Sequence, residues 1–435
     1  MPPTPPLQRL HRRPSFFQPH RTFVDARVKW IRDRALDHAV EKEKHLQPFH
    51  ALKDLLLLPS SAASSSPSGT ALPLAFITAR AAELRLPFRP IRFIRLFPSA
   101  FVEELPSPAS GAPPRPVIRP TFQLLRLHDD ERRALEATRS DAADRLLRLL
   151  MLAPRRRLPL SVVDRLRWDL GLPRDFARSL LPEYPDYFQI VPSPTGIGGA
   201  LDLELVLYRK DLAVSAMERY AMKTGGYKKG MSLSFPLHFS RGFDLEKKVR
   251  QWLEEWQKLP YISPYEDATH LAPKSDLAEK WTVAMLHEVL HLLVPKKTEK
   301  DNLILLGEHL GLPAGLRKVI THHPGIFYVS NKLRTQTVVL REAYRRNLLV
   351  EKHPLMGLRY QYIHLMHKGK ETDGKKKDKK SKRVTAENNI AGVDEIGEEE
   401  DEDFDEDEED ELSAASGIET EDEESDDEDV KQPAT

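Results

Sequence analysis

Residues 290–330 read "LHLLVPKKTEKDNLILLGEHLGLPAGLRKVITHHPGIFYVS", and residues 149–191 repeat their pattern as "LLMLAPRRRLPLSVVDRLRWDLGLPRDFARSLLPEYPDYFQIV". In both, a leucine-rich helix end runs into a proline and a basic turn, and the next helix ends at L-G-L-P. A further helix then leads into an aromatic strand. A weaker third copy lies upstream, with "DLLLLP" at 54–59, "RLP" at 85–87 and "LFPSAF" at 96–101. The chain therefore contains an internal repeat, with two clear copies and one weaker copy.

Each copy is followed by an apolar segment that continues into a helix, as in "DLELVLYRKDLAVSAMERYA" and "QTVVLREAYRRNLLVE". One unit is thus expected to contain helix, helix, strand, strand and helix. A turn-linked helix pair with a two-stranded ribbon is typical of a winged helix-turn-helix module. We predict an α+β, mostly helical fold of about three tandem helix-turn-helix units with short β-ribbons, winged-helix-like, with disordered termini. The units fall at about 35–140, 141–222 and 275–352.

The formal net charge of zero hides two segments of opposite sign. The run from Asp394 to Asp429 holds 24 of the 66 carboxylates and no lysine or arginine. Residues 1–393 keep 65 of the 66 basic and 42 of the 66 acidic side chains, a net charge of about +23. A basic body favours a polyanionic partner, and nucleic acid is the commonest one.

Both ends of the chain differ in composition from its centre. Residues 1–24 contain four arginines and no carboxylate, which predicts an organellar targeting peptide. The alternative is a short disordered basic N-terminus, because early prolines disfavour a helix. We interpret 368–393 as a basic linker, with a nuclear signal as the alternative, and 394–435 as an acidic disordered tail. No apolar run is long enough to span a membrane, so no membrane partner is expected.

The segment "HEVLH" contains the H-E-x-x-H motif of zinc peptidases, as His287, Glu288 and His291. Counting back from the turn proline places His287 opposite Leu146 and Ala51, His291 opposite Leu150 and Leu55, and Glu288 opposite Leu147 and Leu52, all ordinary apolar helix positions. A zinc peptidase also needs a third ligand and an open position. Glu308 and His309 are available, although nothing marks either.

The absence of cysteine excludes thiolate zinc sites and thiol catalysis, and no phosphate-binding glycine loop is present. We therefore judge the motif a chance match and expect no metal, no cofactor and no enzymatic activity. A zinc hydrolase remains the third alternative, which metal content would distinguish.

Clusters of basic side chains lie beside the turns and in one glycine-containing loop. Such groups would bind phosphates with high, salt-dependent affinity. The candidates for RNA binding are Arg89, Arg92, Arg95, Arg155, Arg156, Arg157, Tyr227, Lys228, Lys229, Lys296 and Lys297. Phe93, Tyr227 and Phe239 are candidates for stacking on unpaired bases, with burial in the core as the alternative for each.

Several stretches together resemble one known family. They are "RVKWIRDRALDHAVEKEKHLQPFHALKDLLLL" (27–58), "LDLELVLYRKDLAVSAMERYA" (201–221), "FPLHFSRGFDLEKKVRQWLEEWQKLPYISPYED" (235–267) and "LGLPAGLRKVITHHPGIFYVS" (310–330). This sequence is similar to the plant organellar RNA recognition (PORR) domain family, the "What's This Factor" proteins. The similarity runs from about Phe23 to about His367.

The resemblance implies a nuclear-encoded protein, imported into mitochondria or alternatively chloroplasts. It implies binding of organellar intron RNA through residues 25–367, in a ribonucleoprotein with other splicing factors. The protein would promote splicing of group II introns without catalysing it. The alternative from the residues alone is a DNA-binding winged-helix-type regulator of organellar or nuclear gene expression, because such modules also serve DNA.

Overall fold

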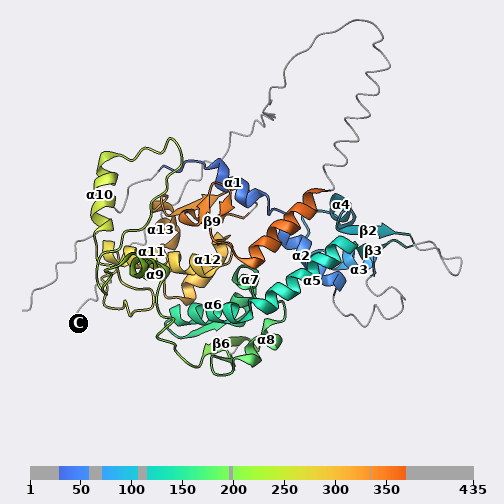
Figure 1. Cartoon of the computed structure of the whole chain (residues 1–435), viewed down its shortest axis with the longest axis horizontal. Helices are drawn as coiled ribbons and strands as arrows, with labels where there is room; N and C mark the ends of the chain where they lie inside the picture. The colour runs from blue at the N-terminus through green and yellow to red at the C-terminus, as the bar shows by residue number, and fades with distance from the viewer. Residues whose placement is uncertain (1–28, 58–70, 106–114, 195–198, 334, 369–435) are drawn as a thin grey trace, which may run out of the picture. The chain divides into compact units, whose positions relative to one another are not determined.

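The computed structural model describes residues 29–57, 71–105, 115–194, 199–333 and 335–368 (Figure 1). The predicted targeting peptide (1–24), nearly all of the basic linker and the acidic tail lie outside these ranges. The described chain consists of helices and small antiparallel sheets. This confirms the α+β class.

The second repeat copy shows the unit most completely. Its elements are the helix α6 (Arg139–Leu152), strand β4 (Arg157–Pro159), helices α7 (Leu160–Leu170) and α8 (Phe176–Ser179), a 3₁₀ turn η1 (Leu181–Glu183), and strands β5 (Phe188–Pro192) and β6 (Leu201–Leu205). β6 lies between β4 and β5 and is antiparallel to both. The second unit thus has three strands, one more than the sequence predicts.

The third and first copies have the same order of elements. The third unit contains α11 (Asp276–Leu292), β7 (Lys297–Glu299), α12 (Lys300–His309), α13 (Leu316–His322), β8 (Phe327–Ser330) and β9 (Thr337–Leu340). The first contains α2 (Leu46–Leu57), β1 (Leu72–Pro73), α3 (Leu74–Ala79), α4 (Pro90–Leu96), β2 (Phe101–Glu104) and β3 (Val117–Pro120). In both sheets the last strand again lies in the middle.

The register between the second and third units is set by backbone conformation. Arg156 and Lys296 both have positive φ, of 53° and 51°, just before the first strand, and Gly171 and Gly311 do at the end of the next helix, with 69° and 70°. Both pairs are 140 residues apart. The count from the turn prolines, 141 residues apart, was therefore wrong by one residue. His287, Glu288 and His291 are equivalent to Leu147, Arg148 and Met151.

The remaining elements connect or flank the three units. They are α1 (Arg34–Glu41), α5 (Phe122–Ala137), α9 (Ala216–Thr224), α10 (Lys247–Gln257), η2 (Arg341–Ala343), the strands β10 (Tyr344–Arg345) and β11 (Leu348–Leu349), and a final helix over 354–368. The segment between α9 and α11 belongs to no repeat. Its Phe235, Trp252 and Trp256 are buried against the third unit.

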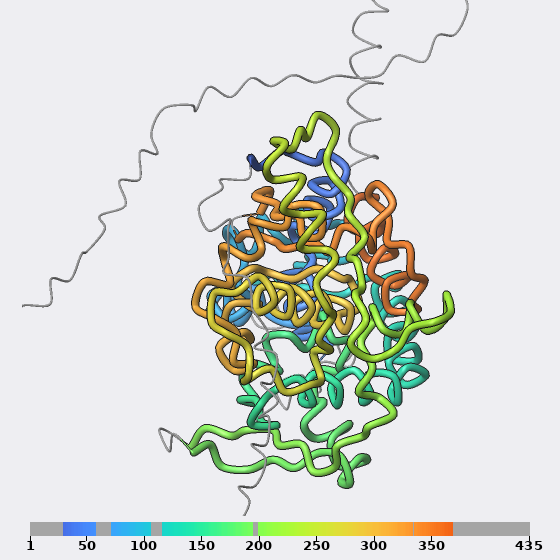
Figure 2. The backbone as a smooth tube through the Cα atoms, turned by 90° about the vertical axis from the view of Figure 1, so that its left-hand side faces the viewer, coloured from blue at the N-terminus to red at the C-terminus, as the bar shows by residue number. Residues whose placement is uncertain are grey.

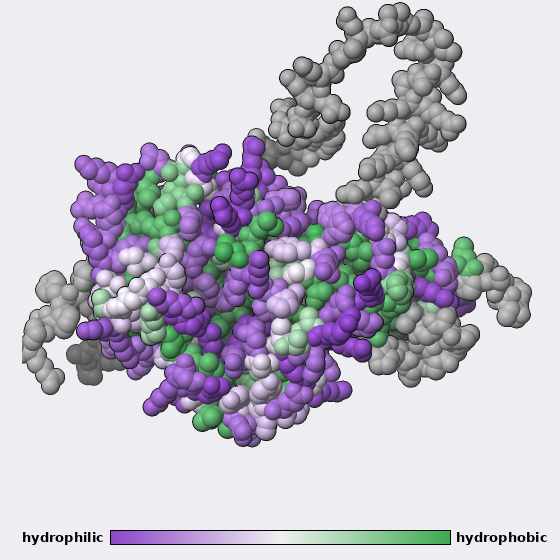
Figure 3. Space-filling model, in the orientation of Figure 1, coloured by the Kyte–Doolittle hydropathy of each residue, from purple (hydrophilic) through white to green (hydrophobic). Residues whose placement is uncertain are grey.

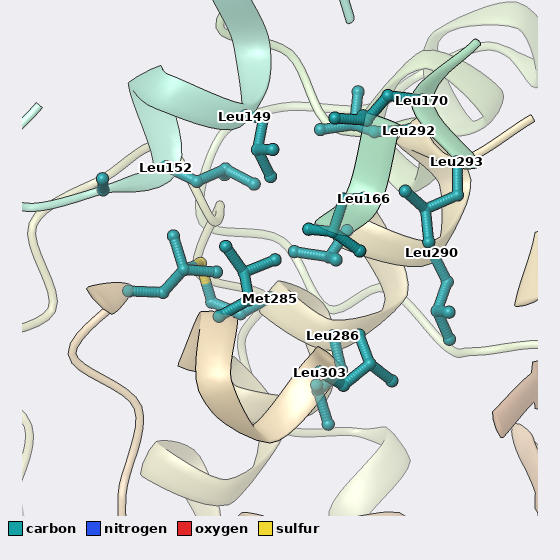
Figure 4. Packing of buried hydrophobic residues seen from close by; sticks show 14 of the residues in the cluster. Leu149, Leu152, Leu166, Leu170, Met285, Leu286, Leu290, Leu292, Leu293 and Leu303 are labelled. Atoms are coloured by element: carbon teal, nitrogen blue, oxygen red, sulfur yellow. The ribbon is translucent and has the colours of Figure 1, made fainter. Parts of the chain in front are cut away.

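The second and third units share one leucine-rich core (Figure 4). The first helices α6 and α11 pack together, as do the second helices α7 and α12. Leu149, Leu166, Leu286, Leu290 and Leu303 are at most 2% exposed in this core. Burial of a leucine side chain contributes about 1.5–3 kcal/mol, so this interface makes the two units fold as one body.

The two ends of the described chain pack onto opposite ends of the array. The helix over 354–368 joins the core of the first unit, where Tyr362 contacts Phe49 at 6.1 Å between ring centroids. α1 instead packs on the third unit, where Leu36 and Val40 meet Tyr328 and Val339. Figure 2 shows this blue N-terminal helix beside the orange strands. The first and third units are thus each completed by a segment distant in sequence.

Candidate functional site

The third helix of every unit presents a basic side chain at the same place. α4, α8 and α13 are these helices, and the third residue of each is Arg92, Arg178 or Lys318. All three side chains are exposed. The same helices bury Phe93, Phe176 and Val319, so each helix has a fixed inner face and its basic residue is held outward. The three units therefore offer three equivalent cationic positions.

α4 carries the densest group of the predicted residues. Arg89, Arg92 and Arg95 are spaced by three along this helix and are all exposed. Arg95 pairs with Glu103 of the neighbouring strand β2 at 3.0 Å. The Arg92 guanidinium lies 5.4 Å from the centre of the Phe88 ring. Arg89 and Arg92 pair with no carboxylate of the described chain, so their charges are free for an anionic ligand.

The predicted arginines of the second unit line a groove of about 680 Å³. Arg155 and Arg157 line it, and Arg174 adds a third guanidinium from the turn before α8. Arg157 pairs with Glu204 at 2.7 Å. Arg156 lies 4.9 Å from the centre of the Tyr208 ring. The groove therefore joins the basic turn to the start of the third helix.

The loop after α9 holds its basic side chains in solvent. Lys228 and Lys229 are exposed, and Lys229 pairs with Glu266 at 3.1 Å. Tyr227 is half-buried and donates its hydroxyl to Glu218 at 3.2 Å. Burial, together with the Glu218 carboxylate, raises the pKa of Tyr227. The ring is tied to the protein but still has accessible area.

Lys296 and Lys297 are buried, and their placement on a binding surface was wrong. Lys297 donates to the Ala39 carbonyl at 2.5 Å and pairs with Glu43 at 3.1 Å. Lys296 donates to the His291 carbonyl and pairs with Glu351 at 2.9 Å. Burial lowers the pKa of both lysines. These contacts hold α1 and the residues after β11 against the third unit. Lys296 and Lys297 are therefore not available to bind RNA at the surface.

Two stacking candidates are also held inside the protein. Phe93 is fully buried among aromatic rings of the first unit. Phe239 is half-buried and stacks on Phe243 with ring centroids 4.8 Å apart. Its ring also fits against Gly325, where an added Cβ would lie 2.8 Å from it. Of the three predicted stacking residues, Phe93 is fully buried, and Tyr227 and Phe239 are half-buried.

The glutamate and the two histidines of the H-E-x-x-H motif have separate hydrogen-bond partners. The Glu288 carboxylate accepts from Arg148 at 2.6 Å, from the Tyr265 hydroxyl at 2.8 Å and from the Ala216 backbone N–H at 2.6 Å. A carboxylate with these partners is a structural group and is not poised to activate water. His287 and His291 instead face Glu342, with their Nε2 atoms 2.9 and 2.7 Å from its Oε1. Sequence analysis did not single out Glu342.

Four exposed basic residues were missed from the sequence, although the repeat itself contained the signal for two of the four. They are Arg174, Arg178, Arg317 and Lys318. Arg178 and Lys318 each lie seven residues after the glycine of L-G-L-P, and Arg92 lies seven after Arg85, which has the same positive φ. Counting from that residue, rather than searching for runs of arginine and lysine, would have found the equivalent positions.

The surface in Figure 3 is largely hydrophilic, with apolar residues gathered in smaller patches. No described helix is both long and apolar enough to cross a membrane.

Comparison with known proteins identifies relatives that match most of this chain. The chain is 35% identical over 347 residues to the Arabidopsis thaliana protein What's This Factor 9, mitochondrial, covering 80% of this chain and 86% of that protein. It is 30% identical to Root Primordium Defective 1 of the same plant, covering 76% and 81%. What's This Factor 1, chloroplastic, from Zea mays is 35% identical over 54% of this chain and 48% of its own length. No solved structure matches the chain.

The family model described as the plant organelle RNA recognition domain matches residues 31–371. That range contains all three repeat units and the segments that complete them. The chain therefore belongs to the plant organelle RNA recognition (PORR) domain family.

Proposed function

We propose that this protein binds organellar intron RNA and promotes group II intron splicing without catalysing it. The observation that carries the proposal is the exposed basic residue repeated at one position of the third helix, as Arg92, Arg178 and Lys318. Three equivalent cations on rigid helices suit a polyanion with regularly spaced phosphates. Family membership makes RNA the polyanion of choice.

We infer that each unit is a winged-helix-like module. Its order of helix, strand, helix, helix, strand, strand, with the last strand central, supports this inference. In helix-turn-helix modules the helix after the turn is the one that meets nucleic acid. That helix corresponds here to α4, α8 and α13. The proposed body is 25–367, with units at about 35–140, 141–222 and 275–352, followed by the linker 368–393 and the tail 394–435.

The mechanism we propose is selective binding of one RNA conformer. In this mechanism the basic positions supply affinity through phosphates. The groove lined by Arg155, Arg157 and Arg174 and the ring of Tyr227 would contact unpaired nucleotides. A ligand that binds the splicing-competent fold more tightly than competing folds shifts the equilibrium towards it. The chemistry stays with the RNA. Other splicing factors are expected in the same ribonucleoprotein.

The first test is charge reversal at the repeated position. The triple variant Arg92→Glu/Arg178→Glu/Lys318→Glu removes three phosphate contacts, so the slope of log K against log salt should fall by about 2 for single-stranded RNA. The matched control is Lys247→Glu/Lys248→Glu/Lys258→Glu, which makes the same charge change at exposed positions on and next to α10. Fluorescence anisotropy with an intron segment measures both. Equal loss in the two variants would contradict the proposed site.

The second test identifies compartment and partner. A tagged copy is immunoprecipitated from purified mitochondria and from purified chloroplasts, and the bound RNA is sequenced. We expect one or a few introns from mitochondria, since the similar protein What's This Factor 9 is named mitochondrial, with chloroplasts as the alternative. Competition with duplex DNA in the anisotropy assay addresses a DNA-binding regulator. Preference for duplex DNA would overturn the proposal.

A further inference from the structure

Three metal-ligating side chains converge beside the first helix of the third unit. His287 and His291 lie one turn apart on α11, and Glu342 reaches them from η2, just after β9. Their nearest ligand atoms all lie within 4.8 Å of one another. Both imidazole Nε2 atoms contact the same carboxylate oxygen, Glu342 Oε1. We infer that His287, His291 and Glu342 form a binding site for one divalent transition-metal ion of the Zn²⁺ type.

The distances from the carboxylate to the two imidazoles fit such an ion with small movement. Zn²⁺ binds imidazole nitrogen and carboxylate oxygen at about 2.0–2.2 Å in tetrahedral geometry, which places neighbouring ligand atoms about 3.3 Å apart. The two Nε2 atoms are now 2.9 and 2.7 Å from Glu342 Oε1. A shift of the carboxylate by about half an ångström therefore opens the space. Loss of the Nε2 protons turns these hydrogen bonds into metal ligation.

The surroundings hold the ligands and leave one way in. The His287 side chain is 2% exposed, and the Phe235 ring lies against it with centroids 5.3 Å apart. His291 and Glu342 are 22% and 18% exposed, so an ion can enter from their side and keep a water ligand there. The nearby cation of Lys296 is paired with Glu351. Two imidazoles and one carboxylate favour Zn²⁺ over Mg²⁺ or Ca²⁺, which prefer oxygen ligands.

The module does not require these residues in order to fold. The equivalents of His287 and His291 in the second unit are Leu147 and Met151, both buried. Pairing of β4 and β7 with the last strand of each sheet makes Glu204 equivalent to Val339, so Leu207 is equivalent to Glu342. All three ligand positions are thus apolar in the sister unit. Of these two units, only the third can be clamped by a metal between its first helix and the turn η2 that follows its last strand.

The clamp we infer is structural rather than hydrolytic. Glu288, which a zinc peptidase would use to activate water, is bound to Arg148, Tyr265 and the Ala216 N–H. A metal on the other three residues would instead tie η2 to α11. The expected consequence is a protein that unfolds at a higher temperature when the ion is bound, because a ligand of the folded state stabilises it.

The test uses the full chain, freed of metal with a chelator and titrated with Zn²⁺ against a chromophoric competitor. We expect one high-affinity ion per chain and a rise in melting temperature that tracks its binding. The variant His287→Leu/His291→Met/Glu342→Leu gives the third unit the residues of the second. It should keep the circular dichroism spectrum and lose more than about 100-fold in Zn²⁺ affinity, because even residues that only support a ligand contribute about 10–100-fold.

His270→Ala is the matched control, since His270 is an exposed histidine outside the cluster. It should bind Zn²⁺ like the parent chain, and Mg²⁺ should bind to neither with comparable affinity. Where the triple variant fails to fold, Glu342→Gln alone serves, with an expected loss above 10-fold. Equal Zn²⁺ binding by the parent and the triple variant, or no stoichiometric ion on the parent, would overturn the site and leave the RNA proposal untouched.

Discussion

Arg148 and Glu288 occupy equivalent positions in two repeat units and meet across the interface between them. Their side chains are only 14% and 1% exposed, and the guanidinium lies 2.6 Å from the carboxylate. The pair closes the contact between α6 and α11. A buried ion pair of this kind contributes little over an apolar pair of similar volume, but removal of one partner strands the other charge.

We therefore predict that Glu288→Ala lowers the free energy of unfolding by about 3–5 kcal/mol. The double variant Arg148→Met/Glu288→Leu should lose clearly less than the sum of Arg148→Met and Glu288→Leu made singly, because no charge is left unpaired. Urea denaturation followed by circular dichroism measures both values. A loss below about 1 kcal/mol for Glu288→Ala would show that the carboxylate is not held as the structure describes.

A second buried charge gives the protein a pH dependence of known sign. Lys280 is 1% exposed, and its ammonium donates to the backbone carbonyls of Gln257 and Leu259 at 2.8 and 2.7 Å. Burial lowers the pKa of Lys280 to about 8 from its ordinary value of 10.5. Between these two values the unfolded chain binds the proton and the folded chain does not. The Lys280 contribution to stability therefore rises as pH increases through this window.

The measurable quantity is the difference in unfolding free energy between the parent and Lys280→Met. It should move in favour of the parent by about 2 kcal/mol between pH 7 and pH 9.5, at about 1.4 kcal/mol per pKa unit. Urea titrations at four pH values establish the slope. Other groups titrate equally in both chains and cancel. A difference that stays constant with pH would mean that Lys280 keeps its ordinary pKa in the folded protein.

The burial and partners of individual side chains were the hardest properties to predict from the sequence. Lys296 and Lys297 were predicted as a surface cluster because they match the exposed arginines after α6. Lys297 is buried under Ala39 and Glu43, which lie over 250 positions away, and Lys296 is buried with Glu351, 55 positions away. Glu342 was missed for the same reason, since it meets His287 only after β9 has returned to α11. A local pattern contains no information about such partners.

At the level of elements, the two L-G-L-P motifs end α7 and α12 in the same conformation but in different surroundings. Gly171 and Gly311 have φ of 69° and 70°, where an L-residue is strained. A Cβ on Gly171 would lie 2.8 Å from Leu355 and 2.9 Å from Arg145. A Cβ on Gly311 would meet only Pro154, at 3.3 Å. The first glycine is thus needed for its size as well as for its backbone.

We predict that Gly311→Ala costs about 1–2 kcal/mol of stability from backbone strain alone. Gly171→Ala should cost at least about 1 kcal/mol more, because Leu355 and Arg145 must move aside. Thermal unfolding of the two variants in parallel gives the comparison, and each serves as the control for the other. Equal losses would show that the contacts around Gly171 adjust freely.

Elements with a strong pattern were predictable, and short ones were not. The helix pairs and the aromatic strands followed from apolar periodicity and turn residues. β1, β4 and β7 contain two or three residues each, too few for any periodicity, and they form only because a returning strand pairs with them. The register between units was misjudged because it was counted from the turn prolines. The residues with positive φ, Arg156 and Lys296, mark the equivalent positions of the two turns.

For the whole molecule, the acidic residues after Asp394 oppose the strongly basic remainder of the sequence. We expect the tail to compete with RNA for the same cations, so deletion of 394–435 should raise the affinity for random RNA at low salt. The effect should disappear as salt screens the attraction. A tail of equal length with asparagine and glutamine in place of its acids is the control, and it should behave like the deletion. Unchanged affinity in both would make the tail a solubilising segment only.

If residues 1–24 are the targeting peptide that the sequence predicts, the docking of α1 on the third unit limits where a processing peptidase could cut the chain. Trp30 donates its indole N–H to the Val329 carbonyl at 3.1 Å and stacks on Tyr328, whose hydroxyl donates to Asp37 at 2.8 Å. Cleavage before Trp30 leaves these contacts in place. Cleavage beyond Asp37 would uncover a strand almost three hundred residues downstream. The position of such a cleavage site is therefore tied to the integrity of a sheet at the far end of the sequence.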